Sequence, residues 1–219
     1  MHLSIFNGSP RKKSSNTEIL LASFIEGFCA NTKNTVTSYY LMEKSKRHEH
    51  LDAFEKSDLI IVAMPLYCFA MPSIVKDFIE AIPSETQNPQ RKLSFIIQSG
   101  FEESCHSEAL KAYFDSLPKF IPCNYLGTII KGGVEGIKVK PPFMVKKITG
   151  SFFKLGAVLA ESGTFDRQIA TKMAAPRVYS KFTIFMMNLF VLKIANSFWN
   201  KQLNENGAYA QRFAKPYAP

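Results

Sequence analysis

The 219-residue sequence is poor in acidic residues and contains only one tryptophan and four cysteines. Its 18 Asp and Glu are outnumbered by 27 Lys and Arg, giving a formal net charge of +9. Such a charge favours anionic partners, but does not choose among phosphorylated cofactors, nucleic acid and acidic lipid. A hydrophobic content of 46%, a charged content of 21% and a mean hydropathy of −0.05 exclude a disordered, fibrous or polytopic membrane protein.

The four cysteines lie far apart and form no C-x-x-C pair. We therefore expect reduced thiols, no iron–sulfur cluster and no metal site. The first residues, MHLSIFNGSP, lack a basic region followed by a long apolar run, which predicts no secretory signal and a cytoplasmic protein.

Several catalytic and nucleotide-binding signatures are also missing. The chain has no G-x-G-x-x-G after its first apolar segment, no P-loop, no G-x-S-x-G and no C-x₅-R. His48 and His50 lack the four-residue spacing of a zinc-binding helix. No nucleic-acid-binding module is recognisable, so we expect no nucleic-acid partner.

Apolar runs alternate with amphipathic stretches along the chain. The runs predict strands at 3–6, 35–41, 58–63, 93–97 and 125–130. Helices are predicted from Ser15 or Asn16 to 28, and at 51–56, 72–82, 104–117, 145–161 and 181–203. Strands separated by helices imply a five-stranded parallel sheet in a three-layer α/β sandwich. We expect one domain over 1–219, with its core signature region at 1–137 and a basic, then apolar, helical extension at 138–219.

In such a sheet, ligands bind outside the carboxyl ends of the strands. The polar segment 9–17 follows the first predicted strand and is rich in hydroxyl and amide side chains. Together with the free N–H groups of the next helix and a cation from Arg11 or Lys13, it favours a phosphate. The alternative is a capped helix behind a solvated basic loop, although a cap requires only one of the four polar residues at 14–17.

Two further segments follow predicted strands. The stretch 65–72 contains two prolines, two aromatic residues and a methionine, which suit either a rigid wall for a flat ring or a turn that covers the core. The stretch 98–104 contains Gly100, which allows backbone to approach a ligand closely.

These residues resemble a known family. Asn7-Gly8-Ser9-Pro10-Arg11 followed by Ser15-Asn16-Thr17 resembles the N-G-S-P-R…N-T signature of flavodoxin-like NAD(P)H-dependent FMN reductases. Pro65-Leu66-Tyr67, with Met71-Pro72 and Lys76-Asp77-Phe78-Ile79, resembles their second signature in residues and spacing. The resemblance spans residues 1–133, and Ser14-Ser15 depart from it where the family usually has a glycine.

The resemblance implies a flavodoxin-like sandwich that binds FMN. The first loop would hold the phosphate, the second would line the ribityl chain and ring edge, and the third would close over the ring. The implied cofactor-binding residues are Ser9, Arg11, Ser15, Asn16 and Thr17 at the phosphate, Pro65, Leu66, Tyr67 and Cys68 along the flavin, and Ser99, Gly100 and Phe101 over the ring.

The implied activity is electron transfer from NAD(P)H through FMN to a small acceptor such as a quinone or flavin. This scheme requires no side-chain acid or base, so we assign no catalytic residue. Two alternatives stay open. One is a non-catalytic FMN electron carrier, which the +9 charge disfavours because such carriers are usually acidic. The other is a flavin-free scaffold that associates through the C-terminal helix.

The stretch 182–199 is strongly apolar, with Lys193 inside it. Its length and this lysine disfavour a membrane span. A homodimer-forming or core-covering helix is the main expectation, and contact with a membrane surface, aided by lysines upstream, stays open. The preceding stretch, 138–163, is interpreted either as a lid over the flavin or as a solvated basic helix face.

Overall fold

The computed structural model describes residues 1–30, 33–83 and 88–215. The chain divides into two compact units, Met1–Arg177 and Val178–Pro219. All the strands and all the predicted cofactor-binding residues belong to the first unit.

The first unit is built on a parallel sheet of five strands. The strands are β1 (His2–Asn7), β2 (Thr35–Tyr40), β3 (Leu59–Pro65), β4 (Lys92–Gln98) and β5 (Asn124–Lys131). Their order is β2-β1-β3-β4-β5, and every neighbouring pair is parallel. The predicted five-stranded parallel sheet is therefore confirmed, and the order reverses between β1 and β3, where such sheets bind ligands.

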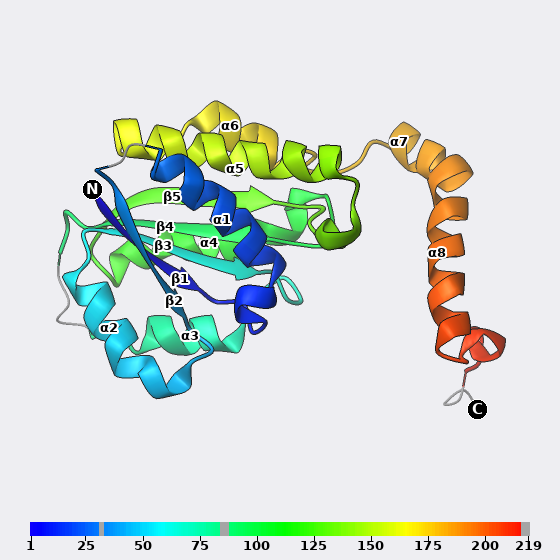
Figure 1. Ribbon diagram of the computed structural model, residues 1–219, viewed down its shortest axis with the longest axis horizontal. Helices are drawn as coiled ribbons and strands as arrows, with labels where there is room; N and C mark the ends of the chain where they lie inside the picture. The colour runs from blue at the N-terminus through cyan, green and yellow to red at the C-terminus, as the bar shows by residue number, and fades with distance from the viewer. Residues whose placement is uncertain (31–32, 84–87, 216–219) are drawn as a thin grey trace. The chain divides into compact units, whose positions relative to one another are not determined.

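Helices cover both faces of the sheet. They are α1 (Asn16–Phe28), α2 (Arg47–Lys56), α3 (Ser73–Glu80), α4 (Glu108–Ser116), α5 (Pro142–Ser162) and α6 (Arg167–Met173). Figure 1 shows α1 and α5 on one face and α2 and α3 on the other. Along β3, Ile61 and Ala63 pack into the core with α1 and α5, whereas Ile60 and Val62 pack into the opposite core. Because both faces of β3 are buried, its sequence is a continuous apolar run.

Two glycines bring α1 and α5 into backbone contact. A Cβ at Gly27 would lie 2.0 Å from the carbonyl oxygen of Phe153, and one at Gly156 would lie 2.1 Å from that of Phe24. The three-layer sandwich consequently extends past residue 137, because α5 supplies buried core residues such as Leu155. The lid role for this stretch stays a prediction.

Three helical details differ from the sequence-based expectations. The helix predicted at 51–56 begins at Arg47, and α6 was not predicted, because its seven residues are too few to show a period. Asp166 caps α6 by accepting a hydrogen bond from the N–H of Ile169 at 2.9 Å. The helix predicted at 181–203 is interrupted by a π-helical turn at Met187–Val191, which apolar spacing does not reveal.

The second unit consists of α7 (Lys181–Met186), the π-helical turn and α8 (Leu192–Glu205), followed by a short 3₁₀ turn. Several of its large apolar side chains are exposed, among them Phe182, Phe185 and Trp199. Within the described part of the chain, no helix combines the length and the hydropathy needed to cross a membrane. Homodimer formation and membrane-surface contact through this unit stay predictions.

Candidate functional site

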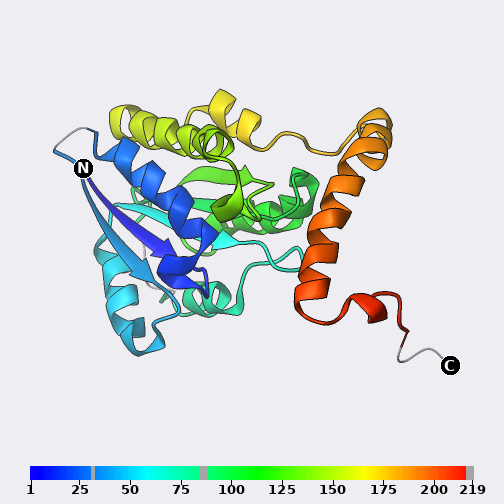
Figure 2. The same ribbon diagram turned by 45° about the vertical axis from the view of Figure 1, so that its right-hand side comes forward.

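The predicted residues lie on three loops at one edge of the sheet. The loops follow β1, β3 and β4, and the carboxyl ends of these parallel strands meet there, as the arrowheads show in Figures 1 and 2. The fold therefore brings segments around residues 9, 66 and 100 to the same side of the molecule.

The first loop ends in a capped helix. The Ser15 hydroxyl accepts a hydrogen bond from the N–H of Glu18 at 3.0 Å and donates one to the carbonyl of Lys12 at 2.6 Å. The cap predicted from the sequence is confirmed, and it uses the Ser15 side chain. The N–H groups of Asn16 and Thr17 lie in the first turn of α1, where a helix offers them no acceptor. They leave a donor pair at the positive end of the helix dipole.

Buried amide and hydroxyl groups near this cap form hydrogen bonds with neighbouring strands and loops. Asn16 Nδ2 donates to the carbonyl of Val134 at 3.4 Å, and Gln98 Nε2 donates to Thr17 Oγ1 at 3.3 Å. Ser9 is also buried, and its N–H donates to Asn7 Oδ1 at 2.9 Å. This end of α1 is thus fixed to β4 and to the loop after β5.

Positive charge surrounds the first loop. Arg11 and Lys13 are exposed, and Lys12 forms an ion pair with Glu43 at 3.4 Å. The Lys138 ammonium donates a hydrogen bond to the carbonyl of Ser14 at 2.6 Å. Sequence reasoning did not assign Lys138 to this loop, since no local spacing relates residues that far apart.

A second carboxylate, besides Glu43, lies close to this cationic loop. Glu18, in the first turn of α1, accepts hydrogen bonds from Asn7 Nδ2 at 2.8 Å and from the Tyr40 hydroxyl at 2.9 Å. Burial, together with the hydrogen bond and charge of Glu18, raises the pKa of Tyr40 to about 12. Both oxygens of Glu18 are therefore engaged in a network with β1 and β2.

The second loop is a tight two-residue turn. The backbone groups of Tyr67 and Ala70 exchange two hydrogen bonds of 2.9 Å. Between them, Cys68 has a φ of 48° and Phe69 a φ of 64°. Two successive left-handed residues define a type I′ turn, which glycine or asparagine normally occupies. The Tyr67, Cys68 and Phe69 side chains of this strained turn are exposed.

Aromatic contacts join the second loop to the third. The His106 ring lies 5.4 Å from the Phe69 ring and 5.0 Å from the Phe101 ring, measured between centroids. Phe101 is 70% exposed, and its carbonyl accepts a hydrogen bond from the Ser99 hydroxyl at 2.8 Å. The contacts of His106 could not be predicted from the sequence, because they depend on the conformation of both loops.

The remaining predicted residues, Pro65, Leu66 and Gly100, lie at the start of the second loop and within the third. Pro65 is the buried last residue of β3, and the N–H of Leu66 donates to the carbonyl of Gln98 at 2.8 Å. Gly100 is exposed, and a Cβ built on it would lie 3.3 Å from the Glu135 side chain.

A cavity of about 580 Å³ lies beside the third loop. Its walls come from Glu102, the residues after β5, α5 and α6, and they include none of the predicted cofactor-binding residues. Over residues 1–30, 33–83 and 88–215 we find no group of three or more His, Cys, Asp or Glu arranged to hold a metal ion.

Comparisons with known proteins agree with this architecture. An NADPH-quinone reductase from P. pentosaceus superposes with a TM-score of 0.56 at 16% identity, covering 73% of this chain and 98% of that one. An NAD(P)H:quinone oxidoreductase from Methanothermobacter marburgensis gives 0.58 at 14% identity, with coverages of 73% and 96%. An FMN-dependent NADH-azoreductase from Bacillus anthracis, solved in complex with FMN, gives 0.52 at 18% identity, with coverages of 73% and 97%.

At these identities the solved structures support the fold alone. No curated protein sequence matches the chain significantly. A family model described as "Flavodoxin-like fold" matches residues 1–135, which is more than half of the sequence. The chain therefore belongs to this flavodoxin-like family.

Proposed function

We propose that the protein is an FMN-dependent oxidoreductase that transfers electrons from NAD(P)H to a small acceptor such as a quinone or a flavin. The observation that carries this proposal is the pairing, at one sheet edge, of a cationic helix N-terminus with exposed aromatic loops. The similarity in fold to FMN-dependent and quinone-reducing enzymes supports it.

The residues around the start of α1 fit a phosphate monoester. The N–H groups of Asn16 and Thr17 supply donors, and the exposed cations Arg11 and Lys13 supply charge. Ser15 acts as a positioning residue in this proposal, because its hydroxyl is already shared between two backbone groups.

The second and third loops fit a flat ring. Exposed Tyr67 and Phe101 offer apolar surface, and the rigid turn through Cys68 fixes the edge of the site. Bound FMN supplies the hydride and electron transfer chemistry. The chain's own residues orient the ring and shield it from water, and no side chain is assigned as an acid or a base.

Comparing FMN with riboflavin tests the phosphate site, since riboflavin lacks the phosphate. In an Arg11→Gln/Lys13→Gln variant, we expect FMN to bind about tenfold more weakly because charge-assisted hydrogen bonds are lost. Riboflavin affinity is expected to stay unchanged, with binding followed by quenching of flavin fluorescence. A Lys119→Gln variant, altered at an exposed lysine elsewhere, is the control. Equal losses for the two flavins would refute the assigned phosphate site.

The proposal also covers the location, the oligomeric state and the partner of the protein. We place the protein in the cytoplasm, as a homodimer associated through its apolar C-terminal unit. A small-molecule acceptor is its expected partner.

A further inference from the structure

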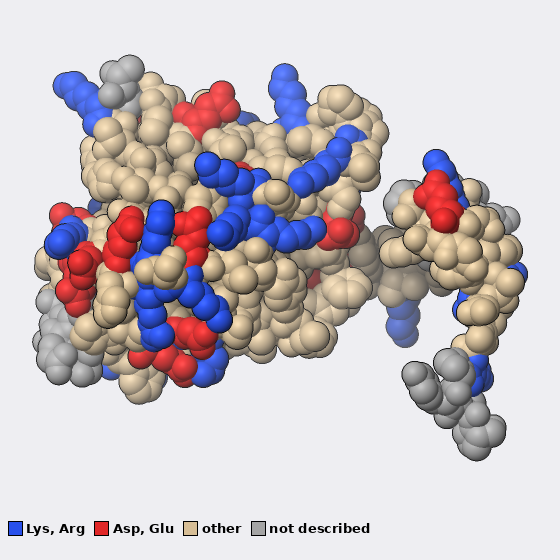
Figure 3. Space-filling view, turned by 60° about the horizontal axis from the view of Figure 1, so that its bottom comes forward, with Lys and Arg blue, Asp and Glu red and all other residues tan. Residues whose placement is uncertain are grey.

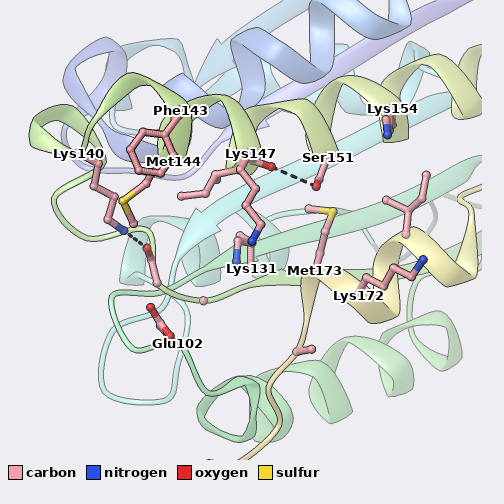
Figure 4. A pocket seen from close by; sticks show the side chains of 15 residues that line it. Glu102, Lys131, Lys140, Phe143, Met144, Lys147, Ser151, Lys154, Lys172 and Met173 are labelled. Carbon is pink, nitrogen blue, oxygen red and sulfur yellow. Dashed lines mark hydrogen bonds between the residues drawn. The ribbon is translucent and has the colours of Figure 1, made fainter. Parts of the chain in front are cut away.

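The cavity beside the third loop is large enough for a small organic molecule. Its volume of about 580 Å³ lies within the roughly 300–1,000 Å³ that is typical of ligand pockets. Figure 4 shows its walls, formed by α5 on one side, the end of β5 and the following glycines on another, and α6 on a third. All of these elements belong to the first compact unit.

Five lysines line this cavity, together with a single carboxylate. They are Lys131, Lys140, Lys147, Lys154 and Lys172, and the carboxylate is Glu102. Lys147 and Lys154 lie two helical turns apart on α5, about 10 Å along its axis. Positive charge therefore extends along the length of the cavity.

The lysines near the end of β5 are crowded. Burial lowers the pKa of Lys131, the charges of Lys140 and Lys147 lower it further, and Glu102 raises it. Figure 4 shows the Lys147 side chain extending from α5 towards Lys131. Lys140 is held in place by a hydrogen bond to the carbonyl of Gly133. An anion bound among these ammonium groups would relieve their mutual repulsion.

The rest of the lining is largely apolar. Phe143, Met144 and Ile148 project from α5, and Met173 from the end of α6. Phe143 is 73% exposed, so its ring is available to a ligand. A simple inorganic ion would leave this surface uncovered, whereas an anion with an apolar body would contact both parts of the cavity.

The cavity is separate from the loop proposed for the FMN phosphate. That loop lies at the start of α1, and the lysine that reaches it is Lys138, whereas Lys140 reaches the cavity. The third loop touches both regions, with Phe101 in the aromatic cluster and Glu102 on the cavity wall.

We propose that this cavity is a second ligand site that binds an amphipathic organic anion, a carboxylate or phosphate ester attached to an aromatic or aliphatic body. Lys131, Lys140 and Lys147 bind the anionic group, and Phe143, Met144 and Met173 contact the apolar body. The site does not depend on flavin binding, and it is distinct from the FMN site.

Titration calorimetry with 2-naphthoate and 1-naphthyl phosphate tests the proposal on the full chain, with and without FMN. We expect both probes to bind, and the neutral analogue 2-naphthalenemethanol to bind at least about tenfold more weakly. The tighter of the two anions identifies the preferred anionic group. Lys147→Gln and, separately, Lys131→Gln are expected to weaken the anions about tenfold while leaving the neutral analogue unaffected.

Lys146→Gln is the matched control, because Lys146 lies on the same helix, is exposed and does not line the cavity. It removes the same charge, and we expect less than a twofold change. Equal weakening by Lys146→Gln and Lys147→Gln would show nonspecific attraction and overturn the proposal. So would absence of binding by both anions, or competition between FMN and 2-naphthoate for one site. Flavin binding is measured independently, so failure of either proposal leaves the other standing.

Discussion

At the scale of single residues, the first loop is compatible both with a helix cap and with a phosphate site. Ser15 caps α1 with its hydroxyl, while the N–H groups of Asn16 and Thr17 lie in the first turn, where a helix offers them no acceptor. In the proposed phosphate site, capping and anion binding thus use different atoms of neighbouring residues. The polar side chains beyond the cap have another task, because Asn16 and Thr17 are hydrogen-bonded to Val134 and Gln98 and so hold this end of the helix in place.

A buried histidine makes stability depend on pH. His50 on α2 is buried, with its ring 6.0 Å from that of Tyr39. Burial lowers the pKa of His50, an effect to which Lys46 adds and which Glu49 and Glu43 oppose. A lowered pKa means that the unfolded chain binds the proton more tightly, so the free energy of unfolding falls as pH decreases through about 6.5.

We therefore expect a His50→Gln variant to lose less stability than the parent protein between about pH 8 and about pH 5.5. Urea denaturation across this range measures the effect. His48→Gln, at an exposed position of the same helix, should keep the parental pH dependence. Parallel curves for His50→Gln and the parent would contradict the assignment.

At the scale of elements, the contact between α1 and α5 depends on the absence of side chains. Gly156→Ala would place a methyl group 2.1 Å from the carbonyl oxygen of Phe24, so the helices must separate. We expect it to lower the free energy of unfolding by about 1–3 kcal/mol, as overpacking does. Chemical denaturation measures the change.

Gly150 on the same helix provides the control, since a Cβ there would meet no atom within 4 Å. Gly150→Ala is expected to raise stability by up to about 1 kcal/mol through helix propensity. Similar effects of the two substitutions would show that the backbone contact does not matter.

Strands and the long helices of the sandwich could be predicted because their signals are local. The run at β3 is apolar on both faces, and the face of α3 repeats at helical spacing through Val75, Phe78 and Ile79. The short helix α6 and the π-helical turn of the second unit could not be predicted, because neither has a distinctive apolar period.

The candidate site likewise has parts that could be predicted from the sequence and parts that could not. The sequence could predict that motif residues such as Thr17 and Tyr67 follow strands at one edge of the sheet, and the structure places them there. The contacts of Lys138 and His106, and the cavity lined by α5 and α6, arise where distant segments meet. No spacing along the chain predicts such meetings.

At the scale of the whole molecule, the excess of positive charge is not spread evenly. On the face drawn in Figure 3, acidic and basic side chains are interspersed in one region, while lysines and arginines form a separate group in another. The net charge of +9 therefore includes local concentrations of positive charge, and the lysines that line the cavity are one of them.

The first compact unit contains the hydrophobic cores that its folding requires. Both hydrophobic cores consist of residues up to Ala174, all within the first unit. We expect a chain truncated after Arg177 to fold and unfold cooperatively, as followed by circular dichroism during thermal denaturation. A truncated chain that is unfolded under native conditions would show that the second unit is required.

The central claim is that the carboxyl edge of the sheet holds FMN for NAD(P)H-dependent reduction. The most direct test is the visible spectrum of the purified full chain after FMN addition and desalting, followed by NADH or NADPH oxidation with a quinone. The account predicts close to one FMN per chain and steady turnover that depends on the bound flavin. A chain that binds FMN without turnover would instead be an electron carrier, and one that retains no flavin would contradict the account.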